Sequence, residues 1–306
     1  MTVRRHPKYA GWLVAGGLGV VCACAPPALP PPEELLRRIS YLVLNPEISC
    51  EQLRDDFQLD GLPINDTPAE AGLRYEEYWV PASDGETLRI WYLPVERPQG
   101  VVIVSPGNTG PMSCYLFTTQ MLTAEGWDVV IYDYEGFGGS SGEALLRPLR
   151  DDLSTVVAWT RAMTGFPQVT LFGMSLGAIP TVAVAVAQPN DVNGVALDSP
   201  IALAREFERF DVLVFGRSEE LISALDPLMD SERVMAGLQQ PLLVFLHELD
   251  FVTPPEDVEA LYFAAAGPKQ LVRFPELHHA RGQFVRTDEY RGHLVDFLNA
   301  VWGVQE

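Results

Sequence analysis

The segment LFGMSLGAIPT, residues 171–181, holds a serine between two glycines in the pattern Gly-x-Ser-x-Gly. This pattern is typical of a nucleophile elbow, a sharp turn between a strand and a helix that lifts a serine hydroxyl clear of a sheet. Five residues match it by chance in roughly one chain of this length in ten. The chain holds a second match, GGSSG at 138–142, so the surroundings of each serine have to identify the nucleophile.

The surroundings favour Ser175 over Ser140 as the nucleophile. A β-branched apolar run at 169–172 leads into Ser175, and a helical pattern at 176–188 follows it. The two glycines of the motif fit such a turn, because a side chain there would clash with the neighbouring backbone. The backbone N–H of Leu176 then lies at a helix N-terminus, where the dipole stabilises an oxyanion. Ser140 lies in a glycine-rich loop with no helix directly after it, so we predict a structural role for it.

Apolar runs rich in β-branched residues alternate along the chain with longer helical patterns. The runs predict strands at 88–94, 101–106, 128–134, 169–173, 194–200, 242–247 and 270–275. The helical patterns lie near 113–125, 148–164, 176–188, 256–266 and 290–302. This alternation predicts an α/β fold, with helices on both faces of a mostly parallel sheet. A hairpin with Asp84-Gly85 at its turn supplies an antiparallel edge.

The N-terminus predicts secretion and a lipid anchor. Three basic residues precede an apolar run of 14 residues at 10–23, which is too short to span a bilayer and is typical of a signal peptide at 1–23. The run leads into Val-Cys-Ala-Cys, which resembles a bacterial lipobox with lipid on Cys24; an ordinary signal peptide cut nearby is the alternative. The predicted protein is extracytoplasmic and membrane-anchored. Because Ala25 and not Asp follows the cysteine, the periplasmic side of the outer membrane is favoured in a Gram-negative source.

Three further segments follow the predicted signal peptide. A proline-rich tether at 24–32 precedes a helical extension at 33–74, which we expect to pack against the main domain at 75–306. Within that domain, residues 201–241 carry apolar side chains at helical spacing. They predict a small helical cap over the carboxyl edge of the sheet.

Composition excludes several classes of function. The formal net charge of −20 becomes −23 once residues 1–23, with three basic and no acidic residues, are removed. A surface this acidic argues against nucleic acid as a partner, because binding to phosphates requires clustered Lys and Arg side chains. No Walker motif occurs, and the dinucleotide-binding fingerprint fails because Ser141 stands where its third glycine belongs. The adjacent pair His278-His279 points opposite ways on an extended segment, which argues against a metal site. We therefore expect neither metal nor cofactor. Cys50 and Cys114 either form a disulfide or are buried thiols.

Two residues downstream of Ser175 complete a set suited to nucleophilic catalysis. Asp250 and His279 each come just after a predicted strand. Parallel sheets place their sites at the carboxyl ends of strands, and Ser, Asp, His is a known triad order. An isolated Asp is usually solvated and an isolated His usually structural. Three such residues in this order at three strand ends predict a catalytic triad, with His278 as the alternative base one residue away.

Residues 75–306 resemble the α/β-hydrolase family, and within it the branch of serine-aminopeptidase-like and Bem46-like hydrolases. The stretch YDYEGFGGSSGEALLRPLRDD is similar to the segment after that branch's second parallel strand, and LDFVTPP to its acid-bearing loop. The resemblance implies an α/β-hydrolase fold. It also implies that Asp250 is the acid and that His279 occupies the catalytic histidine position.

The chain departs from the family pattern at two places near the site. The family has His-Gly before its oxyanion loop, whereas this chain has SPGNTG, with Pro106 in place of the histidine. The loop must therefore be supported differently, although the backbone N–H groups of Asn108 and Leu176 are still the expected oxyanion donors. Glu135 replaces the family's usual Arg and adds negative charge near the site.

Together these residues predict a serine hydrolase that cleaves an ester or related acyl bond of a small molecule. Peptidase and thioesterase chemistry would use the same residues, as would an acyltransferase with an alcohol as acceptor. A binding lipoprotein could keep the fold without the activity. In the cap, Phe207, Phe210 and Leu213 either bury against the sheet or line an acyl pocket. A compact cap and an acidic surface predict short to medium, neutral or cationic acyl esters.

Overall fold

The computed structural model describes residues 30–56, 59, 62–209, 211, 216–224 and 226–304. The predictions for the signal peptide and for Cys24 lie outside the described residues, as do those for Phe210 and Leu213. From Pro31 onward the chain forms one compact unit.

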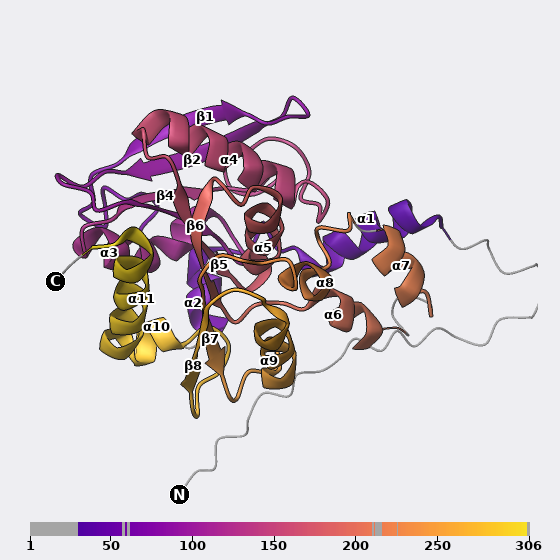
Figure 1. Ribbon diagram of the computed structural model, residues 1–306. Coiled ribbons are helices and arrows are strands. Elements are labelled where there is room, and N and C mark those ends of the chain that lie inside the picture. Colours follow the sequence, from indigo (N-terminus) through magenta and orange to yellow (C-terminus); the bar gives the residue numbers. More distant parts are fainter. Residues whose placement is uncertain are drawn as a thin grey trace, which may run out of the picture. The chain divides into compact units, whose positions relative to one another are not determined.

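An eight-stranded sheet carries the fold, with the strand order β1-β2-β4-β3-β5-β6-β7-β8 (Figure 1). The strands are β1 (Glu76–Pro81), β2 (Thr87–Leu93), β3 (Val101–Ser105), β4 (Asp128–Tyr132), β5 (Val169–Met174), β6 (Val192–Asp198), β7 (Leu242–His247) and β8 (Lys269–Phe274). The β1–β2 hairpin pairs antiparallel with β4, and the remaining neighbours pair in parallel. The predicted sheet is confirmed, and the seven strands with predicted bounds, β2 to β8, each lie within two residues of those bounds.

Helices cover both faces of this sheet (Figure 1). They are α1 (Pro32–Val43), α2 (Cys50–Asp56), α3 (Leu116–Ala124), α4 (Leu149–Thr164), α5 (Ala178–Ala187), α6 (Leu203–Arg209), α7 (Ser218–Ala224), α8 (Ser231–Met235), α9 (Pro255–Ala264), α10 (Gly282–Val285) and α11 (Thr287–Trp302), with short 3₁₀ turns η1 (Met112–Tyr115) and η2 (Ser175–Gly177). Apolar side chains of α3 and α11 join one core, and those of α4, α5, α8 and α9 join the other. None of the described helices combines the length and apolar character needed to cross a bilayer.

Strand β3 shows why the central runs are continuously apolar. Its side chains alternate between the two faces of the sheet, so Val101 and Ile103 enter one core while Val102 and Val104 enter the other. All four are fully buried, which stabilises the fold by roughly 1.5–3 kcal/mol for each side chain. A strand covered on both faces has no solvent side and therefore carries no polar alternation.

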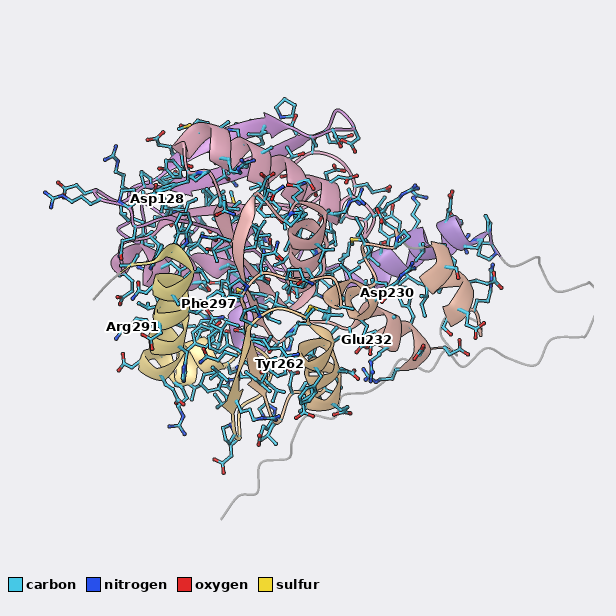
Figure 2. All side chains as sticks on the ribbon, viewed as in Figure 1. Asp128, Asp230, Glu232, Tyr262, Arg291 and Phe297 are labelled. Carbon is cyan, nitrogen blue, oxygen red and sulfur yellow. A yellow bond between two sulfur atoms is a disulfide. The ribbon has the colours of Figure 1, made fainter. Side chains whose placement is uncertain are left out.

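Helix α11 shows the complementary, amphipathic pattern (Figure 2). Phe297 is buried in the core beneath the sheet, whereas the Arg291 guanidinium lies outside and pairs with Asp288 and Glu125. The helix ends at Gly303, which has a φ of 66°, a left-handed conformation that glycine adopts without strain.

The N-terminal extension packs on the main domain. Leu35 and Ile39 of α1 are buried in the core, and α1 lies against α7. Helix α2 begins at Cys50, which forms a disulfide with Cys114 across 64 positions of sequence. Closing a loop of this length removes entropy from the unfolded chain worth on the order of 4 kcal/mol. Of the two alternatives that the sequence left open, the structure has the disulfide.

Candidate active site

Ser175 occupies a strained turn at the carboxyl end of a central strand. It directly follows β5 and begins η2, ahead of α5. Its φ is 51°, in the left-handed region that a non-glycine residue adopts at a cost of about 1–3 kcal/mol. Strain of this kind clusters at active sites, where the surrounding structure holds the backbone in place.

The two glycines of the motif permit close contacts around this turn. A Cβ at Gly173 would lie 2.6 Å from the carbonyl oxygen of Gly177. A Cβ at Gly177 would lie 2.1 Å from the carbonyl oxygen of Ser105, at the end of β3. Neither position has room for a side chain, so the motif brings the Ser175 turn against the end of the neighbouring strand.

Ser140 has a structural environment instead. Its Oγ donates to the Asp133 carbonyl at 2.7 Å and accepts the backbone N–H of Arg89 at 2.9 Å. These bonds tie the glycine-rich loop to β2 and to the end of β4. Ser140 does not line the cavity that contains Ser175.

Asp250 and His279 are in direct contact. The Asp250 Oδ2 lies 2.7 Å from the His279 Nδ1 and accepts the Thr253 hydroxyl at 2.6 Å, while Oδ1 accepts the backbone N–H groups of Val252 and Thr253. Burial raises the pKa of Asp250, but the hydrogen bonds from His279 and Thr253 outweigh it and hold the pKa below its ordinary value. Asp250 is therefore an ionised, firmly oriented acceptor for the imidazole.

His278 points elsewhere. It is exposed, and its Nδ1 lies 2.8 Å from the carbonyl oxygen of Leu249. His279, in contrast, is buried and lines the same cavity as Ser175. The structure thus brings His279, and not its neighbour, together with Asp250.

The two expected oxyanion donors flank Ser175. Leu176 is its direct neighbour in η2, where the first N–H groups of a helix have no intrahelical partner. On the other side, a Cβ at Gly107 would lie 3.7 Å from the Ser175 Cβ, so the loop containing Asn108 runs beside the serine. Asn108 also lines the cavity. Backbone N–H groups converging from two loops are suited to stabilising a developing oxyanion.

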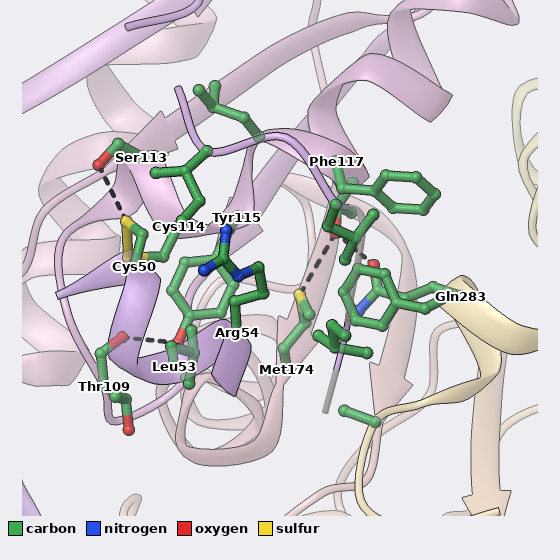
Figure 3. A pocket seen from close by; sticks show the side chains of 18 of the residues that line it. Cys50, Leu53, Arg54, Thr109, Ser113, Cys114, Tyr115, Phe117, Met174 and Gln283 are labelled. Atoms are coloured by element: carbon green, nitrogen blue, oxygen red, sulfur yellow. Dashed lines mark hydrogen bonds between the residues drawn. A yellow bond between two sulfur atoms is a disulfide. The ribbon is translucent and has the colours of Figure 1, made fainter. Parts of the chain in front are cut away.

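Ser175 and His279 line a cavity of about 320 Å³. Figure 3 shows other residues of its lining. Its inner wall includes Phe117 and Met174, and Thr118 donates a hydrogen bond to Gln283 across it at 2.7 Å. The outer wall comes from the N-terminal extension, through Cys50, Leu53, Arg54, Leu59, Leu62, Pro63, Ile64 and Asn65. Among the described lining residues, Arg54 is the only Lys, Arg, Asp or Glu.

The described part of the predicted cap does not form the wall of this cavity. The described part of 201–241 forms α6–α8, and none of it lines the cavity. Its apolar side chains pack elsewhere: Phe207 is buried in the core, and α8 packs on α5 and α9. The wall that faces Ser175 is instead supplied by a segment more than a hundred residues earlier in the chain.

Glu135 does not line the cavity either. It is buried beside Asp152, whose Oδ2 accepts the Glu135 backbone N–H at 3.0 Å. Burial raises the pKa of both carboxyls. The interaction between them raises the pKa of Asp152 further and lowers that of Glu135. Asp152 therefore keeps its proton to a higher pH than an ordinary Asp, with a pKa of about 9.

This pair predicts a pH-dependent effect of Asp152→Asn. Above the ordinary Asp pKa of 3.8 the unfolded chain releases a proton that the native pair retains, so native stability falls as pH rises. Asparagine is permanently neutral, so the variant should gain stability over wild type by up to about 1.4 kcal/mol per pH unit between pH 5 and 8. Urea unfolding across this range measures the difference. The control is the half-exposed neighbour Asp151→Asn, and an equal, pH-independent change in both variants would contradict the proton retained by Asp152.

A buried polar network behind the site was not foreseen from the sequence. Gly282 donates its backbone N–H to the His247 Nε2 at 2.9 Å, so the ring proton sits on Nδ1, 2.9 Å from the Ser199 Oγ. Ser199 also accepts the N–H of Ala280 and bonds Asp198. Burial lowers the pKa of His247, which keeps the ring neutral.

This network holds the backbone that directly follows His279. The sequence indicates this network through polar residues at the ends of buried strands. Asp198 and Ser199 end the apolar run of β6, and His247 ends β7. Within the described residues, no group of three or more His, Cys, Asp or Glu is arranged to hold a metal ion.

Comparison with known proteins supports the fold and identifies the family. The family model described as serine aminopeptidase, S33, matches residues 96–223. The uncharacterized protein YfhR of Escherichia coli K12 is 28% identical over 227 residues, covering 71% of this chain and 78% of that protein. The uncharacterized protein Rv2307c of Mycobacterium tuberculosis is 30% identical over 204 residues, covering 65% of this chain and 70% of that protein.

Among solved structures, the Pyrococcus furiosus esterase Pf2001 superposes with a TM-score of 0.64 at 20% identity, covering 77% of this chain and 96% of the esterase. Together with the matched family model and the relatives, the eight-stranded sheet identifies this chain as a member of the α/β-hydrolase superfamily.

Proposed function

We propose that this protein is a serine hydrolase that cleaves esters or related acyl bonds through Ser175, His279 and Asp250. The observation that carries the proposal is the 2.7 Å contact between Asp250 and the Nδ1 of His279, beside a cavity that also contains Ser175. An ionised Asp250 keeps the ring proton on Nδ1, which leaves the Nε2 lone pair to act as a base.

The proposed reaction has two halves. His279 takes the proton of Ser175 as its Oγ attacks the acyl carbon, and the N–H groups of Leu176 and Asn108 stabilise the oxyanion. The protonated imidazole then donates to the leaving group, which departs and leaves an acyl-enzyme. Water attacks this ester with His279 again as base, and the acid is released.

Transfer of the acyl group to an alcohol is the second candidate reaction, since the acyl-enzyme is common to both. Product analysis in water with competing alcohols separates them. Acid as the main product at millimolar alcohol supports hydrolysis, whereas a dominant new ester supports transfer.

The cavity favours small, apolar acyl groups. At about 320 Å³ it lies at the lower end of the range for small-molecule sites, and most of its lining is apolar. The α2 residue Leu53 lies in its outer wall (Figure 3). A short or medium acyl chain can be desolvated there, and a long chain has to extend into water. Because Arg54 is the charged group at the wall, the overall acidic charge does not determine the charge preference of the site.

A chain-length series of nitrophenyl esters tests this substrate class. We expect kcat/KM to be highest for acyl chains of roughly two to eight carbons and to fall at least about tenfold for long chains, since each methylene left in water forfeits about 0.8 kcal/mol of binding. Leu53→Trp should narrow the cavity and move the optimum toward acetate. The control is Met163→Trp, on the exposed surface of α4. A preference for long chains in the wild type would contradict a closed acyl site.

We also propose that the protein is secreted and held at a membrane by lipid on Cys24. The lipobox-like sequence supports this proposal, and so does the Cys50–Cys114 disulfide, because disulfides persist in oxidising compartments. Mass spectrometry of the mature N-terminus tests it: a diacylglyceryl cysteine is expected, and an unmodified N-terminus near Pro26 would exclude it.

A further inference from the structure

The loop with the proposed oxyanion donor is held from outside by the N-terminal extension. The N–H of Asn45 donates to the Asn108 carbonyl at 2.8 Å, and the N–H of Gly110 donates to the Asn45 carbonyl at 3.0 Å. Asn45 and Thr109 thereby form a parallel bridge. The Asn108 side chain adds a hydrogen bond from Nδ2 to the Val43 carbonyl at 2.7 Å. A short piece of the extension thus pairs with the oxyanion loop as a strand pairs with its neighbour.

Close packing reinforces this pairing. Gly110 has a φ of 69°, and a Cβ there would lie 2.7 Å from the carbonyl oxygen of Ile48 and 2.9 Å from the Sγ of Cys114. Glycine is required on both grounds, because the conformation is left-handed and the space is filled. The extension therefore lies directly on the backbone of the loop.

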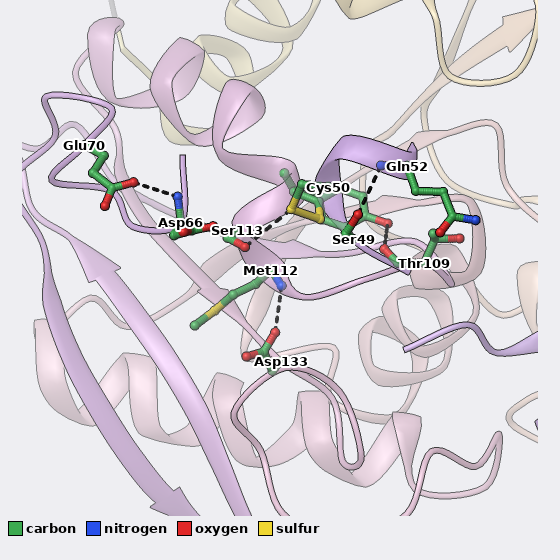
Figure 4. Close-up of a disulfide and its surroundings, with 11 residues drawn as sticks. Ser49, Cys50, Gln52, Asp66, Glu70, Thr109, Met112, Ser113 and Asp133 are labelled. Atoms are coloured by element: carbon green, nitrogen blue, oxygen red, sulfur yellow. Dashed lines mark hydrogen bonds between the residues drawn. A yellow bond between two sulfur atoms is a disulfide. The ribbon is translucent and has the colours of Figure 1, made fainter. Parts of the chain in front are cut away.

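The disulfide joins the extension to the segment that follows the oxyanion loop (Figure 4). Cys50 follows the paired segment and begins α2, while Cys114 lies in η1, just after the loop. The N–H of Met112 also donates to the Asp133 Oδ1 at 2.7 Å, which fixes the start of η1. The loop is thus tied at one end to β3 and at the other to η1, with the extension bonded along its outer edge.

The position of the Asn108 N–H depends on these contacts. Pro106 stands where the family has a histidine, so the support usual in the family is missing and the extension takes its place. The loop passes beside Ser175, as the 3.7 Å separation at Gly107 shows. A displacement of about 1 Å in a catalytic group can cost on the order of 10²-fold in rate.

We propose that residues 43–50 position the oxyanion hole and that the Cys50–Cys114 disulfide locks them there, so that full activity requires the oxidised protein. The proposal rests on the serine hydrolase function proposed above. A dithiol reductant reduces this disulfide. The two sulfurs of the reductant form a disulfide, the Cys50–Cys114 bond breaks, and both cysteines become thiols. Asn45 acts through the loop and not on the substrate, so it is a positioning residue.

The first test is reduction of the folded, full-length protein with dithiothreitol. We expect kcat for a short nitrophenyl ester to fall about 10- to 100-fold, with KM changed less than about threefold, and to recover on reoxidation. The double variant Cys50→Ser/Cys114→Ser should show the same lowered kcat and no response to dithiothreitol. Circular dichroism and urea unfolding confirm that the sheet persists under the assay conditions.

The second test removes one hydrogen bond of the ladder. Asn45→Pro lacks the N–H that donates to Asn108 and should lower kcat by a similar factor, whereas Glu51→Ala, an exposed position outside residues 43–50, should not. A trifluoromethyl ketone, whose adduct with the serine places an oxyanion in the hole, should lose affinity in parallel with kcat/KM. Fluorophosphonate titration should still count a full complement of active sites, which a merely unfolded fraction would not give.

The outcomes separate this inference from the function on which it rests. The positioning role would be overturned if kcat were unchanged after reduction and in Asn45→Pro, or if the only effect were a raised KM. The extension would then only line the cavity. If the oxidised wild type neither cleaves esters nor reacts with the fluorophosphonate, the proposed function itself is overturned.

Discussion

Replacing Ser175 with alanine is expected to lower kcat for ester hydrolysis by on the order of 10⁶-fold, the effect of removing the nucleophile of a triad in a well-studied protease. The reason is geometric. The left-handed backbone at Ser175 and the contacts at the two motif glycines place this hydroxyl beside the oxyanion loop, in the cavity that also contains His279. Alanine leaves that scaffold in place and removes the attacking atom, so binding should survive while acyl-enzyme formation stops.

The second Gly-x-Ser-x-Gly match provides the matched control for this experiment. Ser140→Ala removes two hydrogen bonds that hold a loop to β2 and to the end of β4. It should therefore lower the stability by about 1–3 kcal/mol and leave most of the turnover. Fluorophosphonate labelling followed by peptide mass mapping should find the probe on Ser175. Label on Ser140, or equal loss of activity in both variants, would show that the wrong serine was chosen.

Local patterns were sufficient to predict the sheet and the candidate triad. β5 is a buried apolar strand that ends in a glycine-flanked serine, and both the strand and the turn are determined by residues close together in sequence. Asp250 and His279 were identifiable because parallel strands carry their functional loops at one edge, so strand order along the chain already implies proximity in space.

The wall of the cavity could not be predicted in this way. Apolar spacing at 201–241 is the same whether a helix covers a site or packs on a neighbouring helix, and here α8 packs on α5 and α9. The extension reaches the site through backbone hydrogen bonds at Asn45 and a disulfide that spans 64 positions. Backbone pairing leaves almost no side-chain signature, and two cysteines alone do not reveal whether they pair.

Replacing Asp250 with asparagine is expected to lower kcat about 10⁴-fold, although the two side chains have the same shape. The Oδ1 accepts two backbone N–H groups, so the carbonyl oxygen of an asparagine would take that position. Its NH₂ group would then replace Oδ2, which faces the Nδ1 of His279 at 2.7 Å. An amide donor there forces Nδ1 to accept, which moves the ring proton to Nε2, where a general base needs a lone pair.

The control for Asp250→Asn is Glu248→Gln, because this carboxylate lies two residues away on the surface, near Arg273. It should leave kcat within about twofold of wild type, since exposed ion pairs contribute little. Folded stability and the affinity for a substrate-like amide should stay close to wild type in Asp250→Asn, so that the loss appears in kcat and not in KM. Near-normal turnover in Asp250→Asn would mean that another group orients His279. A matching loss in Glu248→Gln would mean that the change of charge, and not the tautomer of the histidine, limits the reaction.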